Sequence, residues 1–531
     1  MLYGTSEKDL DRVAALLRDG QVVAIPTETV YGLAANAMDE QAVAAIFRAK
    51  GRPADNPLIV HISDLDQLDK IAEPTPLAYR LAEAFWPGPL TMILPKKPVI
   101  PSLVSAGLST VAVRFPSHPV ARAIIRKAGV PLAAPSANKS GKPSSTRAEH
   151  IEKDYDGKIA VVDAGGCACG VESTVLSLVN DPPVLLRPGF ITPSMLRQYI
   201  PNLRIADAVL HALPENEKAL SPGLKHRHYA PEADTVCVTG SSRNAAKYIG
   251  LATPHTMRAC VICYTGEEPL YPGIATIPYG KESDEAEQAA NVFDRLREAD
   301  AGKFDRIYVR THLSDGVGLA VYNRLLRACS FHVINADETP FVAGVTGPMG
   351  SGKSVFGSLA EAHGYTLLDA DKIYAELLPS LMSSLKEAFG PEIENPDGTL
   401  NRPLLAKTVF GDESARQKLN ALTHPAVLDE IGKRILTGTA KRVLVEAIAL
   451  IESGFSRLCD VTVAIWSTRE QSRARICLRD NLSPEDAERR LNAQKEPSFY
   501  REHTDYGIQN DDLDKLKQDT ETLLKLWEEI Q

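Results

Sequence analysis

The sequence predicts a multidomain α/β protein in which short buried strands alternate with helices. Three observations support this fold class. Short apolar runs alternate with helical patterns along the 531 residues. A glycine-rich phosphate-binding motif with its own strand and helix lies far from the N-terminus, at residues 347–354. Hydrophobic residues make up 44% of the chain and charged residues 24%, as is usual for a globular protein. At roughly 150 residues per domain, the length allows about three domains.

Composition narrows the class of protein. The formal net charge of -9 argues against nucleic-acid binding by bulk phosphate neutralisation, although a local basic patch is compatible with it. The eight cysteines lack zinc-ligand spacing. No window reaches the ~20 apolar residues of a membrane span, and the first residues do not have the pattern of a signal peptide. We therefore expect a cytoplasmic protein with no membrane segment and no strong direct binding to nucleic acid.

Polar side chains gather where the first predicted elements end. A strand at 22–25 leads into Pro-Thr-Glu-Thr at 26–29, which brings two hydroxyls and a carboxylate to the end of the strand. The next helix, from about residue 40, ends at Lys50 before a glycine stop. Residues 50–61 then bring cations, an amide and an imidazole into one connection. A routine capped helix is the alternative, but this clustering favours a ligand site.

Two further segments favour the same site. In the strand at 110–115, alternation places Val111, Val113 and Phe115 on one face and Thr110 and Arg114 on the other. An exposed sheet face is the alternative for that strand alone. A buried strand from residue 131 leads into a loop, ending near residue 144, that is rich in hydroxyls and backbone donors. Such loops suit phosphate or carboxylate recognition.

Changes in pattern predict four regions. Helical and strand patterns continue to about residue 205, and a segment rich in turn residues and cations follows. Short strands then flank a helix near 284–298, which predicts a small Rossmann-like α/β domain. The predicted limits are 1–205 for the first domain, 206–231 for a linker or lid, 232–335 for the small domain and 340–531 for a P-loop domain.

The last region carries the signature of a phosphotransferase. The motif Gly-x-x-x-x-Gly-Lys-Ser at 347–354 follows an apolar strand, so its backbone N–H groups can surround phosphate oxygens. Lys353 can reach the outer phosphates, and Ser354 can bind Mg²⁺. A second buried strand ends at Asp369 and Asp371, which suit Mg²⁺ handling or deprotonation of a substrate hydroxyl. One of the two acids can instead cap the next helix. Arginines between 469 and 490 are typical of a closing lid, and a solvated charged face is the alternative.

The first three regions together resemble the YrdC-like threonylcarbamoyl-AMP synthase family, in its longer two-domain branch. The shared motifs are Pro-Thr-Glu-Thr-Val-Tyr-Gly at 26–32, Lys50-Gly-Arg52 with Asn56, His61, Trp-Pro-Gly-Pro-Leu-Thr at 86–91, Arg114, Pro-Ser-Ala-Asn at 135–138, Glu-Ser-Thr-Val at 172–175, Leu-Arg-Pro-Gly at 186–189 and the linker motif at 221–231. The resemblance implies a twisted open sheet and a nucleotidyltransferase. That enzyme makes threonylcarbamoyl-AMP and pyrophosphate from L-threonine, bicarbonate and ATP, for the tRNA-threonylcarbamoyl transfer machinery.

The same resemblance assigns roles to residues. It implies that threonine binds to Thr29, His61, Arg114 and Thr174. It implies that ATP binds to Arg52, Asn56, Thr110, Ser136, Asn138, Ser144, Arg187 and, near the phosphates, the catalytic Lys50. Arg227 and Tyr229 of the linker would close over the cavity as a lid and contact ATP. We expect no protein general base, because positioning and cationic stabilisation dominate this reaction.

The last region resembles dephospho-CoA kinase through the P-loop, the Asp369 and Asp371 pair, Gly-Thr-Leu-Asn-Arg at 398–402, His424 with its proline, and the arginine lid. The resemblance implies γ-phosphoryl transfer from ATP to the 3'-hydroxyl of dephospho-CoA. It assigns ATP to Gly347, Gly350, Ser351, Gly352, Lys353, Ser354 and Val355, with Ser354 on Mg²⁺. It assigns the acceptor to Asp369, Asp371, Arg402 and His424, and catalysis to Asp371, Lys353 and Arg479. Pro348 and Val355 depart from the family pattern.

Alternatives of other classes stay open from sequence alone. The first region is also compatible with a module that binds double-stranded RNA without catalysis. The last region is compatible with another small-molecule kinase or with a regulatory nucleotide-binding domain. A bifunctional, ATP-using transferase that joins tRNA modification to coenzyme A synthesis is the reading that the motifs favour.

Overall fold

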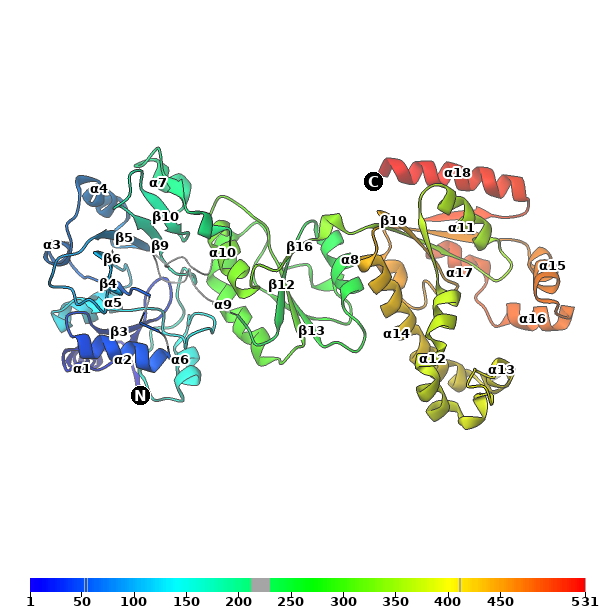
Figure 1. The fold of residues 1–531 in the computed structure, drawn as a ribbon, viewed down its shortest axis with the longest axis horizontal. Coiled ribbons are helices and arrows are strands. Elements are labelled where there is room, and N and C mark those ends of the chain that lie inside the picture. Colours follow the sequence, from blue (N-terminus) through cyan, green and yellow to red (C-terminus); the bar gives the residue numbers. More distant parts are fainter. Residues whose placement is uncertain (52, 55, 212–229, 410–411, 531) are drawn as a thin grey trace. The chain divides into compact units, whose positions relative to one another are not determined.

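A computed structural model describes residues 1–51, 53–54, 56–211, 230–409 and 412–530. The chain divides into two compact units, Met1–Thr239 with Arg258–Ile334, and Gly240–Met257 with Asn335–Gln531. Three sheets, each flanked by helices, form the framework (Figure 1). This arrangement confirms the predicted multidomain α/β class. In the described part of the chain, no helix is long and apolar enough to cross a membrane.

The first sheet combines parallel and antiparallel pairs. Its order within the described residues is β1-β8-β2-β3-β7-β4-β6-β5-β9-β10-β11. The strands are β1 (Leu2–Tyr3), β2 (Val23–Ile25), β3 (Gly32–Asn36), β4 (Ile59–His61), β5 (Leu90–Pro95), β6 (Thr110–Arg114), β7 (Leu132–Ala133), β8 (Ala160–Val162), β9 (Thr174–Ser177), β10 (Val184–Arg187) and β11 (Arg204–Ile205). β4 and β6 pair in parallel and bring His61 level with Arg114. Two predicted site residues therefore lie side by side at the strand ends.

Helices cover the first sheet because their apolar stripes match its faces. They are α1 (Glu7–Arg18), α2 (Glu40–Lys50), α3 (Asp66–Ile71), α4 (Pro76–Phe85), α5 (Pro119–Ala128), α6 (Ala148–Tyr155), α7 (Pro193–Arg197) and the 3₁₀ turn η1 (Asp207–Val209). α2 ends at the expected glycine, Gly51, which has a φ of 62°. In β6, Val111 and Val113 face the main hydrophobic cluster and Ala112 faces another, as the alternation predicts.

The second sheet has the order β14-β13-β15-β12-β16. Its strands are β12 (Asp234–Thr239), β13 (Ala259–Cys263), β14 (Ala275–Pro278), β15 (Arg306–Arg310) and β16 (Val333–Asn335), with η2 (Glu268–Leu270), α9 (Glu285–Ala301) and α10 (Gly318–Ala328) between them. One hydrophobic cluster joins Phe293 of α9 and Leu325 of α10 to Val30 and Val171 from the first-sheet region. The two sheets of the first unit therefore share a core.

The third sheet is entirely parallel, with the order β18-β19-β17-β20-β21. Its strands are β17 (Phe341–Thr346), β18 (Thr366–Asp369), β19 (Arg442–Glu446), β20 (Val461–Trp466) and β21 (Tyr506–Gln509). Its helices are η3 (Ala336–Glu338), α11 (Lys353–Ala362), α12 (Ala370–Phe389), η4 (Pro391–Ile393), α13 (Arg402–Val409), α14 (Glu413–Thr437), η5 (Phe455–Leu458), α15 (Arg469–Asp480), α16 (Pro484–Asn492), α17 (Pro497–Glu502) and α18 (Leu513–Ile530). Trp527 of α18 is fully buried against Phe356 of α11.

Helix α8 (Ser242–Ala252) joins β12 to β13 along the chain, yet it belongs to the second unit. Leu251 lies in the same hydrophobic cluster as Ile431 of α14. Lys247 forms a buried ion pair with Asp460, with 2.8 Å between Nζ and Oδ2. The same Oδ2 accepts a hydrogen bond of 2.8 Å from the backbone N–H of Val342. The core of the second unit therefore includes a segment from outside residues 335–531.

Candidate active sites

A polar cavity lies where β2, β4, β6 and the strand before residue 135 end in the first sheet. It is lined by Thr27, Thr29, Val30, Gly32, Lys50, Ile59, His61, Arg114, Ala134, Pro135, Ser136, Asn138, Ser140, Glu172, Ser173 and Arg187. The fold brings together seven residues that the sequence assigned to threonine or ATP: Thr29, Lys50, His61, Arg114, Ser136, Asn138 and Arg187. They come from segments spread over more than a hundred residues of sequence.

Arg114 is buried and organises one end of this cavity. Its Nη2 lies 2.7 Å from Glu28 Oε1, and its Nη1 donates a hydrogen bond of 2.8 Å to Thr29 Oγ1. Burial alone would raise the pKa of Glu28, but the charge and hydrogen bond of Arg114 outweigh burial and lower the pKa to about 2. Glu28 is therefore a carboxylate at neutral pH, and it fixes the guanidinium plane.

His61 is a neutral hydrogen-bonding group at neutral pH. Burial and the neighbouring Arg114 charge lower its pKa to about 3. Its Nδ1 lies 3.2 Å from the carbonyl oxygen of Ile59, which is a contact suited to an N–H donor on that nitrogen. The cation at this end of the cavity is therefore Arg114, with the imidazole beside it.

Lys50 and Arg187 hold backbone on the other side of the cavity. The Lys50 ammonium donates to the carbonyl oxygen of Ser136 at 2.5 Å and to that of Asn138. Arg187 donates from Nε to the carbonyl oxygen of Ser173 at 3.0 Å and from Nη2 to its hydroxyl at 3.1 Å. Both cations border the cavity, so this side suits an anion such as a phosphate chain.

Other predicted residues lie beside the cavity or outside the described residues. Of those that the structure describes, Asn56, Thr110, Ser144 and Thr174 do not line it. The Thr174 hydroxyl donates to the carbonyl oxygen of Ile191 at 2.8 Å, and the Ser144 hydroxyl donates to Glu172. Arg52, Arg227 and Tyr229 lie outside the described residues. Sequence reasoning did not assign Glu28 or Ser173, although both stand inside the quoted motifs.

The second site is the loop between β17 and α11. Lys353 donates to the carbonyl oxygens of Gly347 at 3.0 Å and Pro348 at 3.1 Å. Gly347 has a φ of 137°, and a Cβ there would lie 2.0 Å from the carbonyl oxygen of Ile465. Only glycine fits this position. The loop is braced from outside, because Asn510 Nδ2 donates to the Ser351 carbonyl at 2.7 Å.

Carboxylates surround the lysine of this loop. Asp369 caps α12, since its Oδ1 accepts hydrogen bonds from the backbone N–H groups of Asp371 and Lys372. Asp371 is left to face a cavity. Burial and the Asp369 charge raise the pKa of Asp371. Burial lowers the pKa of Lys353 to about 8, against the attraction of Glu446 and Asp371.

Two neighbouring cavities lie beside α12, and Asp371 lines one of them. One of about 260 Å³ is lined by Asp371 and His424, and another of about 560 Å³ is lined by Arg402; Tyr374 and Leu419 line both. The four predicted acceptor residues therefore divide between the cap of α12 and these cavities. A substrate with two parts can occupy such a pair of cavities.

The arginine-rich helices place two side chains near the loop. Arg475 Nη1 donates to the Gly350 carbonyl at 3.2 Å. Arg479 forms an ion pair with Asp480, with 2.7 Å between Nε and Oδ1. The positive charge of Arg479 also lowers the pKa of Asp371, against the larger rise that burial causes. Sequence reasoning named Arg479 but gave Arg475 no separate role. Val355, one residue beyond Ser354, follows on α11 and is partly buried against the core.

Glu446 is a further acid that sequence reasoning did not assign. The Ser354 hydroxyl donates to its Oε1 at 3.3 Å. The sequence feature that could have identified it is the position of Glu446 at the carboxyl end of the buried strand β19. A hydroxyl and carboxylate oxygens are hard ligands that fit Mg²⁺. No group of three or more His, Cys, Asp or Glu side chains in the described chain forms a complete metal site by itself.

Sequence comparison finds three family matches in order. Residues 15–189 match the family described as "Telomere recombination", residues 191–330 match "Threonylcarbamoyl-AMP synthase, C-terminal domain", and residues 341–515 match "Dephospho-CoA kinase". The threonylcarbamoyl-AMP synthase of Bacillus subtilis is 46% identical over 333 residues, which are 62% of this chain and 95% of that protein. The dephospho-CoA kinase of Moorella thermoacetica is 35% identical over 163 residues, which are 29% of this chain and 77% of that protein.

A solved structure is similar to the first two-thirds of the chain. The crystal structure of Pyrococcus abyssi Sua5 complexed with L-threonine has a TM-score of 0.59 and 41% identity, and the match covers 63% of this chain and 99% of that one. The fold and the two sites define a multidomain, nucleotide-using transferase. The chain belongs to the threonylcarbamoyl-AMP synthase family in its first two-thirds and to the dephospho-CoA kinase family in its last third. It is a bifunctional enzyme of these two classes, as the resemblances implied.

Proposed function

We propose that the first site condenses L-threonine, bicarbonate and ATP into threonylcarbamoyl-AMP with release of pyrophosphate, for use by a downstream tRNA-modifying transferase. The observation that carries this proposal is the division of one cavity between Arg114 with Thr29 and His61, and Lys50 with Arg187. The Pyrococcus abyssi relative was crystallised with L-threonine, which supports the amino-acid end.

The residues suit the electrostatics of this reaction. The carboxylate of threonine would meet the Arg114 guanidinium, whose plane Glu28 fixes. The threonine amine would bond to the carbon of bicarbonate with loss of water, which gives a carbamate. A carbamate oxygen would then attack the α-phosphorus, and the bond from that phosphorus to the pyrophosphate oxygen would break. Negative charge would then build up beside Lys50 and Arg187. Neutral His61 would hold substrate by a hydrogen bond and would not act as the base.

We propose that the second site transfers the γ-phosphoryl group of ATP to the ribose 3'-hydroxyl of dephospho-CoA. Asp371 would orient that hydroxyl and accept its proton, a role for which its raised pKa suits it. Lys353 and Arg479 would stabilise charge on the transferring phosphoryl group. The cavity lined by Asp371 and the neighbouring cavity lined by Arg402 would take the adenosine and pantetheine parts of the acceptor.

The side chains around Lys353 also fit a magnesium ion. Ser354 and Glu446 would hold it, with Asp369 nearby. Bound there, Mg²⁺ would supply charge neutralisation and orientation of the β- and γ-phosphates.

One incubation tests both proposals. The intact protein is mixed with ATP, Mg²⁺, threonine, bicarbonate and dephospho-CoA, and all products are identified by mass spectrometry. We expect threonylcarbamoyl-AMP and CoA. Asp371→Asn should lower CoA formation by about 100-fold or more and leave threonylcarbamoyl-AMP formation unchanged, because a positioned base contributes about that factor.

The control is Asp514→Asn on α18, whose side chain is 91% exposed. It should keep both activities. Adenylate formation without CoA, or phosphorylation of nucleoside monophosphates in preference to dephospho-CoA, would contradict the kinase proposal. Salt-dependent RNA binding with no threonine-dependent pyrophosphate release would contradict the synthase proposal.

A further inference from the structure

Two arginines of the small-sheet helices, the partly buried Arg297 and the fully buried Arg324, support the loop that borders the synthase cavity. We call residues 136–145 the nucleotide loop. Arg297 of α9 makes a fork to Asp154 of α6, with 3.0 Å from Nη1 to Oδ1 and 2.8 Å from Nη2 to Oδ2. Its Nε also donates to the carbonyl oxygen of Pro143, in the loop itself, at 3.1 Å. One guanidinium thus holds both the loop and a carboxylate that supports the loop.

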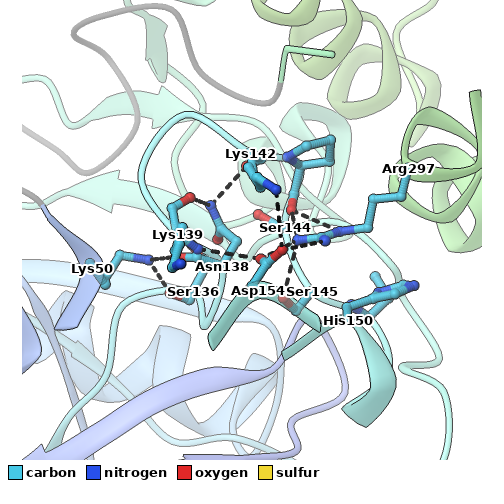
Figure 2. Close-up of polar contacts among 12 residues, drawn as sticks. Lys50, Ser136, Asn138, Lys139, Lys142, Ser144, Ser145, His150, Asp154 and Arg297 are labelled. Carbon is cyan, nitrogen blue, oxygen red and sulfur yellow. Dashed lines mark hydrogen bonds and ion pairs between the residues drawn. The ribbon is translucent and has the colours of Figure 1, made fainter. Parts of the chain in front are cut away.

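Asp154 also contacts the nucleotide loop, through a hydrogen bond and an ion pair. Its side chain is 1% exposed, its Oδ2 accepts a hydrogen bond of 3.4 Å from the backbone N–H of Lys139, and its Oδ1 lies 3.9 Å from Lys142 Nζ (Figure 2). Burial would raise the pKa of Asp154, but the hydrogen bonds and charge of Arg297 outweigh it and lower the pKa. The carboxylate is therefore charged, and its main counter-charge comes from α9.

Arg324 of α10 makes the second connection. It is fully buried and donates from Nε to Glu172 Oε2 at 2.8 Å and from Nη1 to the Pro188 carbonyl at 2.7 Å. The other oxygen of Glu172 accepts the hydroxyl of Ser144, at the end of the nucleotide loop. Glu172 itself lines the synthase cavity. Pro143 and Ser144 of the loop are thus tied to helices of the small sheet, Pro143 directly through Arg297 and Ser144 through Glu172 and Arg324.

These contacts differ from ordinary surface ion pairs. Removing one partner of a buried pair leaves an uncompensated charge, so the geometry is strongly coupled to both residues. The hydrogen bonds to carbonyl oxygens also fix the orientation of each arginine, because a planar guanidinium holds several acceptors in one plane.

We propose that Arg297 and Arg324 are positioning residues of the synthase: they hold the nucleotide loop in the conformation that binds the triphosphate, so α9 and α10 set the affinity for ATP. This inference rests on the proposed synthase function. Threonine would bind at the Arg114 end, whereas the hydrogen bonds of Arg297 and Arg324 described above go to Asp154, Pro143, Glu172 and Pro188. Loss of either arginine should therefore weaken ATP binding selectively.

The test uses the full chain and follows threonine-dependent pyrophosphate release. Arg297→Gln should raise the KM for ATP about tenfold, as expected if the competent loop conformation falls to about a tenth of the population. The KM for threonine and kcat should change less than about twofold. Arg297→Lys keeps the charge and should give a smaller rise. Asp154→Asn should reproduce the ATP effect, and Asp154→Asn with Arg297→Gln should be less than additive.

The matched control is Arg295→Gln on the same helix, because Arg295 makes an i,i+3 pair with the half-exposed Glu298. It should leave both KM values unchanged. CoA formation by each sample reports its content of folded second unit. Equal rises in both KM values, or a fall in kcat alone, would assign the arginines a merely structural role and overturn the proposal.

Hydrogen exchange of the nucleotide loop separates this inference from the function on which it rests. A non-hydrolysable ATP analogue should slow exchange of residues 136–145 in the wild type and slow it less in Arg297→Gln. Equal protection in both would overturn the proposal. If the wild type is protected but releases no pyrophosphate, the synthase function fails, and the comparison of the two proteins still decides the role of the arginine.

Discussion

His61 gives the first unit a defined acid sensitivity. Its pKa is about 3 in the folded protein against 6.5 ordinarily, because burial and Arg114 oppose its protonation. As pH falls below 6.5, the unfolded chain takes up a proton that the folded protein refuses until about pH 3, so stability decreases across this window. His61→Gln should remove up to ~1.4 kcal/mol per pH unit of this slope. Urea unfolding between about pH 5 and 6.5, followed by hydrogen exchange at β4 and β6, measures the slope.

His332→Gln is the control for this measurement, because His332 is exposed in the same unit. It should keep the slope of the wild type. An unchanged slope in His61→Gln would contradict the assignment of a buried neutral imidazole.

Residues at strand ends were predictable singly, but their partners were not. Arg114, His61 and Thr29 carry a local signal, since polar side chains follow short apolar runs. Glu28 as the counter-charge of Arg114 joins positions far apart in sequence, and no periodicity reports such a pair. Thr174 was assigned to threonine, but its hydroxyl is hydrogen-bonded to the backbone carbonyl and N–H of Ile191. These site assignments stay predictions until variants are measured.

At the scale of elements, the backbone of helix α9 packs closely against Gly170, in the first-sheet region. Gly170 has a φ of 69°, and a Cβ there would lie 2.3 Å from the carbonyl oxygen of Ala289 and 2.4 Å from Ala290 Cα. Gly170→Ala should cost about 2–4 kcal/mol, from backbone strain and overpacking together. Because the clash displaces α9, the KM for ATP should also rise. Thermal unfolding and synthase kinetics measure the two effects.

Gly166→Ala is the matched control in the same segment, since a Cβ there meets no atom within 4 Å. Its unfolding midpoint and KM for ATP should equal those of the wild type. A neutral Gly170→Ala would show that α9 is not seated as described.

Elements with strong local signals were predictable, and those defined by partners were not. α2 follows from its apolar stripe and glycine stop, and β6 from its alternation. β1 and β11 have two residues each, so only their pairing in the sheet makes them strands. The cap at Asp369 resolved an ambiguity that the sequence left between two acids.

At the scale of the whole chain, the second unit depends on a helix that precedes it by many residues. Leu251 of α8 is 6% exposed within the cluster of Ile431 and Leu450. Leu251→Ala should destabilise the second unit by about 2–5 kcal/mol, because it removes buried methyl groups and leaves a cavity. The loss of CoA formation on heating should shift to lower temperature. Threonine-dependent pyrophosphate release should keep its thermal profile.

Leu270→Ala, at a leucine that is 43% exposed in the first unit, is the control and should change neither profile. A Leu251→Ala variant whose CoA formation is as heat-resistant as that of the wild type would contradict the role of α8 in the core.

The multidomain α/β class was predictable from two features of the sequence. Short apolar runs alternate with helical patterns, and a P-loop with its own strand, helix and carboxylates lies far from the N-terminus. The limits 1–205, 206–231, 232–335 and 340–531 stay predictions. Lys247 of α8 and Asp460 are paired across 213 residues of sequence, which is a contact that no local sequence pattern indicates.

The position of α8 bears on how such a chain can be divided in evolution or in the laboratory. The kinase-matching stretch begins at residue 341, yet a core leucine and a buried lysine of its unit are encoded ahead of it. A gene split at that point would encode a kinase without α8. The apolar side chains around Leu251 would then be exposed, and Asp460 would lose its ion pair with Lys247. A separately encoded kinase would therefore need other residues to cover the surface that α8 covers here.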